Sequence, residues 1–235
     1  MYVTAIVLSA GRGKRFFRRM SRSKNPGAFK TLVEINRKPV IIYCLETLSR
    51  HPLVKDIIIV ANTDNSRYII RKISQYRIGK VAGVVKGGLR RQDSVRNGLK
   101  ALNSCSDMVL IQDAARPFID KGLISSVIKA AKESGAAIAG VPVKSTIKTV
   151  SKFTVEKTLN RENLWEIQTP QAFKKNLILK AYEKFGNVTV TDDSMLVEKL
   201  GATVSVVLSS YSNIKITTPE DLVSAEAIAK EWNTK

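Results

Sequence analysis

One segment orients the whole chain: Ala5-Ile6-Val7-Leu8-Ser9-Ala10-Gly11-Arg12-Gly13-Lys14-Arg15. Its first residues are mostly apolar and predict a buried strand, which the small and glycine-rich residues after it cannot continue. Glycine lets the backbone turn sharply and lets a ligand approach the main chain closely. Free N–H groups in such a turn, flanked by cations, predict a phosphate-binding loop. An ordinary strand-to-helix turn with a basic flank fits the same residues.

Two familiar nucleotide motifs are absent from this turn. The dinucleotide fingerprint Gly-x-Gly-x-x-Gly fails because Phe16 stands at its third glycine. The P-loop fails because no Gly-Lys-Ser or Gly-Lys-Thr follows. A nucleotide at this loop must therefore be held in another way.

The composition excludes several classes of protein. The 235 residues are 44% hydrophobic with a mean hydropathy of −0.07, which is ordinary for a globular protein. We expect no transmembrane helix, no secretory signal and a cytoplasmic location. Cys44 and Cys105 are isolated and read as reduced thiols. His51 is the sole histidine and stands before Pro52 in a predicted loop, which argues strongly against a His-based nucleophilic triad and a multi-His metal site.

The positive charge is concentrated in one half of the chain. Residues 1–100 hold 22 Lys+Arg and 5 Asp+Glu, whereas residues 101–235 hold 17 and 15. Residues 12–30 alone carry eight cations and no acid. This pattern fits either a nucleic-acid surface or a site for a polyphosphate substrate. Few aromatic residues are spaced for base stacking, which favours the polyphosphate and makes nucleic acid a secondary alternative.

Apolar runs alternate with helical patterns along the rest of the chain. This β–α–β alternation predicts a mostly parallel sheet flanked by helices on both faces, an α/β fold. Ligands of such sheets bind at the carboxyl ends of the strands. The predicted strands are 5–8, 56–61, 81–85, 108–111, 136–143 and 204–208, and the predicted helices are 41–48, 66–76, 94–102, 123–134, 174–184, 194–200 and 219–232.

Residues 143–160 break this alternation. They are rich in β-branched residues and carry no helical pattern, with Ser151-Lys152 as a plausible hairpin turn. We interpret them as a protruding β-arm that would need a partner to cover it. An extra antiparallel strand pair on the main sheet is the alternative.

A few polar residues stand where chemistry is expected. Asp113 ends a predicted strand and could hold Mg²⁺ or cap the next element. Gly87-Gly88 forms a second glycine turn, after which Ser94 could be a helix N-cap or reach a base edge. Lys215 lies in a strand-like run, Asn213 to Thr217, where a lysine is unusual unless its ammonium group reaches a site or solvent.

Together these segments resemble the cytidylyltransferase family that makes 4-diphosphocytidyl-2-C-methyl-D-erythritol. The resemblance covers residues 3 to 228. The matching runs are residues 9–15, Lys30 with 39–40, 87–88 with 91–95, 113–117, 141–144 with 146–148, Arg161 with 164–165 and 168–171, 191–193, and 213–217.

The resemblance implies one Rossmann-like nucleotidyltransferase domain over residues 1–235, dimerising through its β-arm. The reaction would join CTP to methylerythritol 4-phosphate with Mg²⁺ and release pyrophosphate. Arg15 and Lys30 would stabilise the transition state, Asp113 would serve the metal, and Arg161 and Lys215 would position the polyol phosphate. The substrate-binding residues would be Ser9, Ala10, Gly11, Gly13, Gly88, Arg91, Ser94, Arg116 and Thr146, the last contributed by the partner's arm.

The sequence also departs from the family pattern. The segment between Arg15 and Lys30 is several residues longer than expected, and Phe29 replaces the usual proline before the lysine. Lys24 is therefore a competitor for the role of Lys30. A ribitol 5-phosphate cytidylyltransferase is the nearest alternative function, and a degenerate transferase that binds nucleic acid is the alternative from another class.

Overall fold

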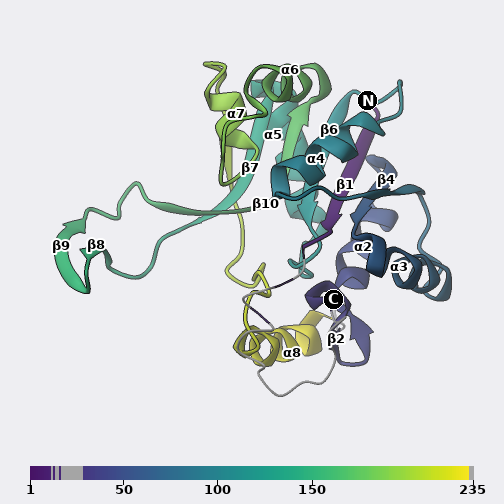
Figure 1. The fold of residues 1–235 in the computed structure, drawn as a ribbon, viewed down its shortest axis with the longest axis horizontal. Helices are drawn as coiled ribbons and strands as arrows, with labels where there is room; N and C mark the ends of the chain where they lie inside the picture. Colours follow the sequence, from purple (N-terminus) through teal and green to yellow (C-terminus); the bar gives the residue numbers. More distant parts are fainter. Residues whose placement is uncertain (12, 14–15, 17–28, 233–235) are drawn as a thin grey trace.

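The computed structural model (Figure 1) describes residues 1–232 except 12, 14–15 and 17–28, so Arg15 and Lys24 lie outside the described residues. The strands are β1 (Val3–Ser9), β2 (Glu34–Ile35), β3 (Lys38–Pro39), β4 (Val54–Ala61), β5 (Val81–Lys86), β6 (Met108–Asp113), β7 (Ala136–Pro142), β8 (Ile147–Ser151), β9 (Thr154–Leu159), β10 (Trp165–Lys174) and β11 (Ser205–Leu208). The helices are the short 3₁₀ turn η1 (Lys30–Leu32), α2 (Val40–Arg50), α3 (Thr63–Gln75), α4 (Arg91–Lys100), α5 (Lys121–Ser134), α6 (Lys175–Phe185), α7 (Ser194–Glu198) and α8 (Glu220–Trp232).

The central sheet has seven strands in the order β11-β7-β10-β6-β1-β4-β5. β1 pairs in parallel with β4 and β6, so that Val7 lies opposite Ile59 on one side and Gln112 on the other. β10 is the exception and runs antiparallel between β6 and β7. The prediction of a mostly parallel sheet flanked by helices is therefore confirmed.

Successive side chains of β1 point to opposite faces of the sheet, where they pack in the hydrophobic cores beneath the two helix layers. Ala5 and Val7 are fully buried in a cluster that also holds residues of α2, α3 and α5. Ile6 points the other way, into a cluster with residues of α4, α6 and α7. A Cβ atom at Gly98 would lie 2.6 Å from Ile6 Cγ2, so the missing side chain lets α4 pack directly on the sheet. These opposed layers hold the carboxyl ends of the strands at a common edge, as expected for such sheets.

A third cluster lies beside this edge and joins α8 to β2 and α2. Phe118 packs 5.6 Å, between ring centroids, from both Tyr43 and Trp232. Ile216 is fully buried in the same cluster. The packing matters for the site because it fixes the backbone around Ile216, to which a candidate catalytic lysine binds.

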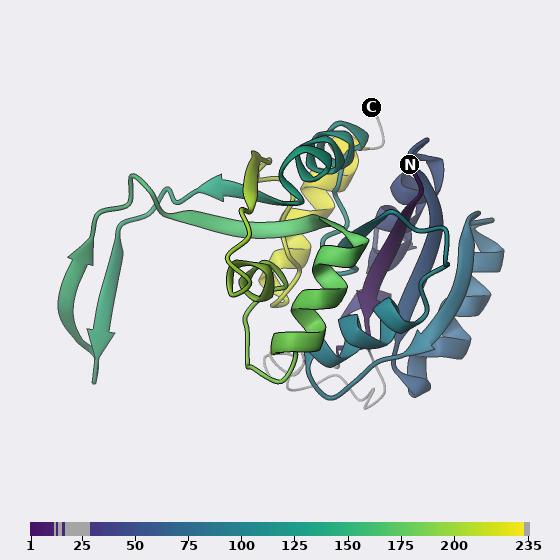
Figure 2. The same ribbon diagram turned by 90° about the horizontal axis from the view of Figure 1, so that it is seen from above.

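The strands β8 and β9 form a separate two-stranded sheet that projects from the body (Figures 1 and 2). Its turn residues are Lys152 and Phe153, with φ of 46° and 65°. The predicted turn, Ser151-Lys152, is wrong by one residue, because a two-residue hairpin loop of this type requires positive φ at both of its central positions. Val150, Phe153 and Val155 are exposed on this arm.

Two further predictions need correction. The predicted strand-like run from Asn213 to Thr217 is not a strand, since Ile216 packs against the α8 cluster instead of pairing in the sheet. Residues 165–174, which were not predicted as a strand, form β10. Among the described residues, no helix is both long and apolar enough to cross a membrane.

Candidate functional site

A cleft of about 1010 Å³ opens where β1, β4, β5 and β6 end. Its position agrees with the rule that ligands of parallel sheets bind at the carboxyl ends of the strands. The predicted site residues in its lining are Ala10, Gly11, Gly13, Lys30, Gly88, Arg91, Ser94, Asp113 and Lys215. We call this space the nucleotide cleft.

The second glycine turn forms one wall of the nucleotide cleft. A Cβ atom at Gly87 would lie 2.2 Å from Cβ of Ala10, and one at Gly88 would lie 2.3 Å from Cβ of Asp93. Both positions therefore need glycine because of close approach. The Gly88 N–H donates to Ser94 Oγ at 3.1 Å, and Ser94 Oγ donates to the carbonyl of Arg90 at 3.2 Å. Ser94 is thus a brace inside α4, and its alternative role as N-cap is wrong because Arg90 holds that position.

The glycine-rich turn after β1 is fixed by hydrogen bonds of Ser9. Ser9 is buried, and its Oγ shares a 2.8 Å hydrogen bond with Thr31 Oγ1. Its carbonyl accepts a hydrogen bond from Asn65 Nδ2 at 3.0 Å. Ser9 does not line the nucleotide cleft, so its side chain ties η1 to β1 while the neighbouring Ala10 faces the cleft. Lys30, in η1, donates from Nζ to the carbonyl of Ile216 at 2.7 Å.

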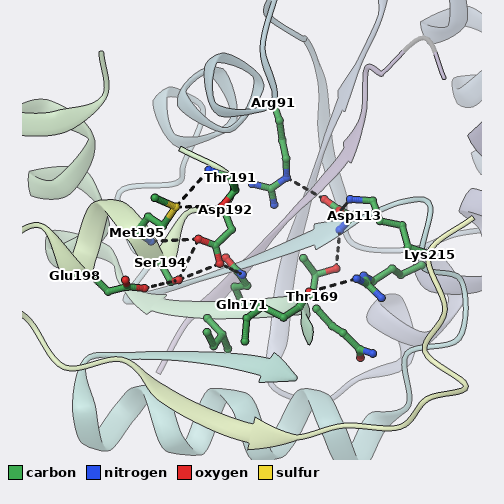
Figure 3. Close-up of a pocket in the computed structure, with 14 residues that line it drawn as sticks. Arg91, Asp113, Thr169, Gln171, Thr191, Asp192, Ser194, Met195, Glu198 and Lys215 are labelled. Carbon is green, nitrogen blue, oxygen red and sulfur yellow. Dashed lines mark hydrogen bonds and ion pairs between the residues drawn. The ribbon is translucent and has the colours of Figure 1, made fainter. Parts of the chain in front are cut away.

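Asp113 is the buried carboxylate of the cleft, and two cations converge on it (Figure 3). Its Oδ1 accepts from Arg91 Nε at 3.2 Å, and its Oδ2 accepts from Lys215 Nζ at 2.5 Å. The backbone N–H of Asp113 donates to Thr169 Oγ1 at 3.1 Å. Burial by itself would raise the pKa of Asp113, but the charges of Arg91 and Lys215 hold that pKa well below its ordinary value. The carboxylate is therefore ionised at neutral pH.

A second cavity, of about 420 Å³, lies on the other side of this ion cluster. Arg91, Asp113 and Lys215 line both spaces, so they form a shared wall. We call the second space the side cavity. Its remaining lining combines polar and apolar side chains, namely Arg116, Ile138, Ile167, Gln168, Thr169, Gln171, Thr191, Asp192, Ser194, Met195 and Glu198.

Arg116 is held at the side cavity by backbone carbonyls. Its guanidinium donates to the carbonyl of Asn213 at 2.7 Å and to that of Ile167 at 3.5 Å. Its Nε is buried and has no hydrogen-bond partner in the described structure. Burial lowers the pKa of Arg116, although Asp113 opposes the shift. Because Arg116 lines the side cavity, its guanidinium charge is suited to an anion bound there.

Thr146 and Arg161 line neither of these two spaces within the chain. Thr146 lies in the segment that leads to the arm, and Arg161 lies two residues after the end of β9. Arg161 is exposed and donates to the carbonyl of Lys144. The predicted pair of Arg161 and Lys215 is therefore not assembled by one chain.

The residues present allow a limited kind of metal site. Among the described residues, no group of three or more His, Cys, Asp or Glu side chains is placed to hold a metal ion. Asp113 nevertheless presents an ionised carboxylate to the nucleotide cleft. Mg²⁺ is commonly bound by one or two carboxylates together with substrate phosphates and water. The site thus fits a Mg²⁺ shared with substrate and does not fit an all-protein cage.

Sequence reasoning missed Asp193 and Tyr182. Asp193 accepts from Arg91 at 2.6 Å and from the Tyr182 hydroxyl at 2.5 Å, although it lines neither cavity. In the sequence, Thr191-Asp192-Asp193 stands out only as one of the runs that match the family. Its adjacent acids, placed before a helix, were the available signal. No local pattern connects them to Arg91, 102 residues away.

Comparison with known proteins agrees with this geometry. The family model described as 2-C-methyl-D-erythritol 4-phosphate cytidylyltransferase matches residues 3–231. A protein of that name from Shouchella clausii is 43% identical to this chain and the match covers 98% of both chains. Another, from Alkaliphilus oremlandii, is also 43% identical, and the match covers 97% of this chain and 94% of its own. A solved 4-diphosphocytidyl-2C-methyl-D-erythritol synthase from Anaerococcus prevotii superposes with a TM-score of 0.82 at 35% identity, covering 97% of this chain and 98% of its own. The chain therefore belongs to the 2-C-methyl-D-erythritol 4-phosphate cytidylyltransferase family.

Proposed function

We propose that this enzyme carries out its family's reaction at the wall shared by the nucleotide cleft and the side cavity. The reaction transfers CMP from CTP to 2-C-methyl-D-erythritol 4-phosphate and releases pyrophosphate. The observation that carries the location is the ion cluster of Asp113, Arg91 and Lys215, which borders both spaces. A nucleotide on one side and a phosphorylated acceptor on the other would meet at this cluster.

CTP would occupy the nucleotide cleft. Gly87 packs directly on Ala10, and together with Gly11 and Gly88 they line the cleft with little side-chain bulk, so the cytidine would lie against the main chain there. Ser94 would act indirectly: its hydroxyl oxygen accepts a hydrogen bond from the Gly88 N–H and so keeps the backbone of the turn in the conformation that binds CTP. The family's preference for cytosine would then depend mainly on backbone groups, since the adjacent Leu89 is apolar and fully exposed.

The chemical step needs alignment and charge neutralisation more than a protein nucleophile. The acceptor phosphate would attack the α-phosphorus of CTP in line with the departing pyrophosphate. Lys30 would stabilise the charge on the transferring group, and its contact with the Ile216 carbonyl holds it near the cleft until substrate binds. Arg15 would assist in the same way. When bound beside Asp113, Mg²⁺ supplies further neutralisation of the phosphate oxygens.

The acceptor would lie at the side-cavity face of the cluster. Lys215 and Arg116 supply positive charge there from one chain. We propose that Arg161 and Thr146 are contributed by the arm of a second subunit in a homodimer. The exposed apolar side chains of the arm, including Phe153, support this role because they would need a covering surface. We also propose that the enzyme works in the cytoplasm.

Pyrophosphate release tests the function directly. Purified protein is incubated with CTP, Mg²⁺ and either 2-C-methyl-D-erythritol 4-phosphate or ribitol 5-phosphate, and the nucleotide product is identified by mass. We expect efficient release only with the methylerythritol phosphate and no release when Mg²⁺ is chelated. Comparable turnover of ribitol phosphate would overturn the substrate assignment. Full activity in chelator would remove the metal from the proposal.

A further inference from the structure

Arg91 has a second anchor that the proposed reaction does not use. Asp193 stands at the N-cap of α7 and its side chain is 0% exposed. It accepts from Arg91 at 2.6 Å and, through its other oxygen, from the Tyr182 hydroxyl at 2.5 Å. Neither Asp193 nor Tyr182 lines the nucleotide cleft or the side cavity. Arg91 lines the nucleotide cleft and therefore connects these two residues to it.

The two carboxylates that bind Arg91, those of Asp113 and Asp193, differ in their other contacts. Asp113 is also bonded to Lys215. In the proposed reaction it would hold a metal ion as well. Asp193 has no exposure to either space, and its contact with Arg91 is the shorter of the two, 2.6 Å against 3.2 Å. Arg91 can consequently give up Asp113 and keep its place. Of its five N–H donors, the contacts with Asp113 and Asp193 use two, which leaves others for a ligand.

Tyr182 secures the anchor in turn. Burial and the negative charge of Asp193 raise the pKa of Tyr182, so its hydroxyl stays protonated and remains a donor. That hydrogen bond fixes one oxygen of Asp193 and aims the other at Arg91. Because Tyr182 belongs to α6, Asp193 precedes α7 and Arg91 opens α4, the contact also ties three helices together.

We propose that Asp193 and Tyr182 are positioning residues, which hold the Arg91 guanidinium toward the phosphates of CTP independently of its contact with Asp113. This inference rests on the proposed function, in which the nucleotide cleft binds CTP. The competing explanation is purely structural: a buried ion pair that joins α4, α6 and α7 without affecting the ligand. The experiment must therefore separate binding from stability.

The test uses Tyr182→Phe, with Tyr43→Phe as its matched control. Both substitutions remove one buried helical hydroxyl, but Tyr43 donates to the carbonyl of Ile35, away from Arg91. The equilibrium dissociation constant of CTP with Mg²⁺ is measured by calorimetry without acceptor, together with the melting temperature. We expect Tyr182→Phe to weaken CTP binding about tenfold, because misplaced groups lose productive contacts. Tyr43→Phe should lower the melting temperature by a similar amount and leave CTP binding unchanged.

The decisive comparison repeats the substitution in an Arg91→Ala background. If Tyr182 acts through Arg91, Tyr182→Phe should then change CTP binding by less than about twofold, because the two effects are not additive. Asp193→Asn should follow the same pattern and provides a second variant. An unchanged CTP affinity in the single Tyr182 variant would overturn the inference. So would an equal loss of affinity in both backgrounds.

These results separate the inference from the proposed function. Calorimetry measures CTP binding without turnover, so it reports on Arg91 even if the acceptor is misassigned. Wild-type protein that binds CTP but releases no pyrophosphate with 2-C-methyl-D-erythritol 4-phosphate would overturn the proposed function alone. Wild-type activity with no dependence of CTP binding on Tyr182 would overturn the inference alone.

Discussion

Replacing Asp113 with asparagine tests the ion cluster most directly. The substitution keeps the size of the side chain but removes the charge that faces Arg91 and Lys215. The carboxylate is 7% exposed, so its two cations are its main partners and little water reaches it. The oxygen of the asparagine amide can accept a hydrogen bond from one of these two cations, and the NH₂ group of the same amide must then face the other.

The cost in stability should be smaller than for a fully buried pair. Removing one partner of such a pair usually costs about 3–5 kcal/mol. Here Arg91 keeps its contact with Asp193, and the Lys215 side chain is 37% exposed and can turn to water. We therefore expect a loss of about 2 kcal/mol in the free energy of unfolding. For a chain of this size that corresponds to a melting temperature lower by about 4–8 °C. The value of kcat/KM should fall by at least about 100-fold.

The pH dependence of this difference follows from the pKa of Asp113. The folded-state pKa lies below its ordinary value, so the carboxylate contributes stability above the ordinary pKa of about 3.9. That contribution is lost as the pH falls toward the folded-state pKa. The melting-temperature gap between wild type and Asp113→Asn should be constant from about pH 8 to pH 5 and shrink below about pH 4.

Thermal unfolding across pH and pyrophosphate release at neutral pH provide the two readouts. Asp56→Asn is the control, because Asp56 accepts from the Tyr2 hydroxyl at 2.6 Å in β4, away from the cleft lining. It should change stability modestly and leave turnover intact. Wild-type activity in Asp113→Asn would remove Asp113 from the mechanism. A stability gap that widens in acid would refute the electrostatic reasoning.

Three further experiments test other parts of the site. Lys30→Ala should lower kcat by about 100-fold and change KM for CTP little, as measured by steady-state kinetics, since only contacts that strengthen in the transition state speed chemistry. Gly88→Ala should raise KM for CTP about tenfold, because the added Cβ would lie 2.3 Å from a side-chain atom of α4, whereas Gly83→Ala, with open space around it, should be neutral. Inactive Thr146→Ala and Lys215→Ala variants should regain activity when mixed under conditions where subunits exchange, and no rescue despite exchange would place both residues in one subunit's site.

The sheet was largely predictable because its parallel strands are buried on both faces. Runs such as residues 56–61 and 108–111 are almost continuously apolar, which is typical of strands covered by helices. β10 was missed because its centre, Gln168-Thr169-Pro170-Gln171, is polar and contains a proline, which resembles a loop. These side chains are buried all the same, and Gln171 donates to Asp192 at 2.9 Å. Their partners come from distant segments, so no local pattern could reveal the strand.

The site was predictable to the extent that it lies at strand ends. Asp113 and Gly88 follow directly from the rule that the carboxyl edge of a parallel sheet binds ligands, and both line the nucleotide cleft. Lys215 reaches Asp113 from a segment without regular structure, 102 residues further along the chain. Ser9 is the opposite case, since its place in a glycine-rich turn predicts a ligand contact, whereas its side chain is hydrogen-bonded to Thr31 and does not line the nucleotide cleft.

The placement of Arg161 favours a site that two chains complete. Within one chain the side cavity already has three cations at its wall, Arg91, Arg116 and Lys215. Arg161 is instead bonded to a backbone carbonyl beside the arm. The arm carries exposed apolar residues at its tip, including Phe153, and exposed cations near its base. A segment of this composition has little reason to extend into water unless another surface receives it. If a second subunit receives it, Arg161 can approach a phosphate that Lys215 of the other chain already holds, and the acceptor site then forms only in the dimer.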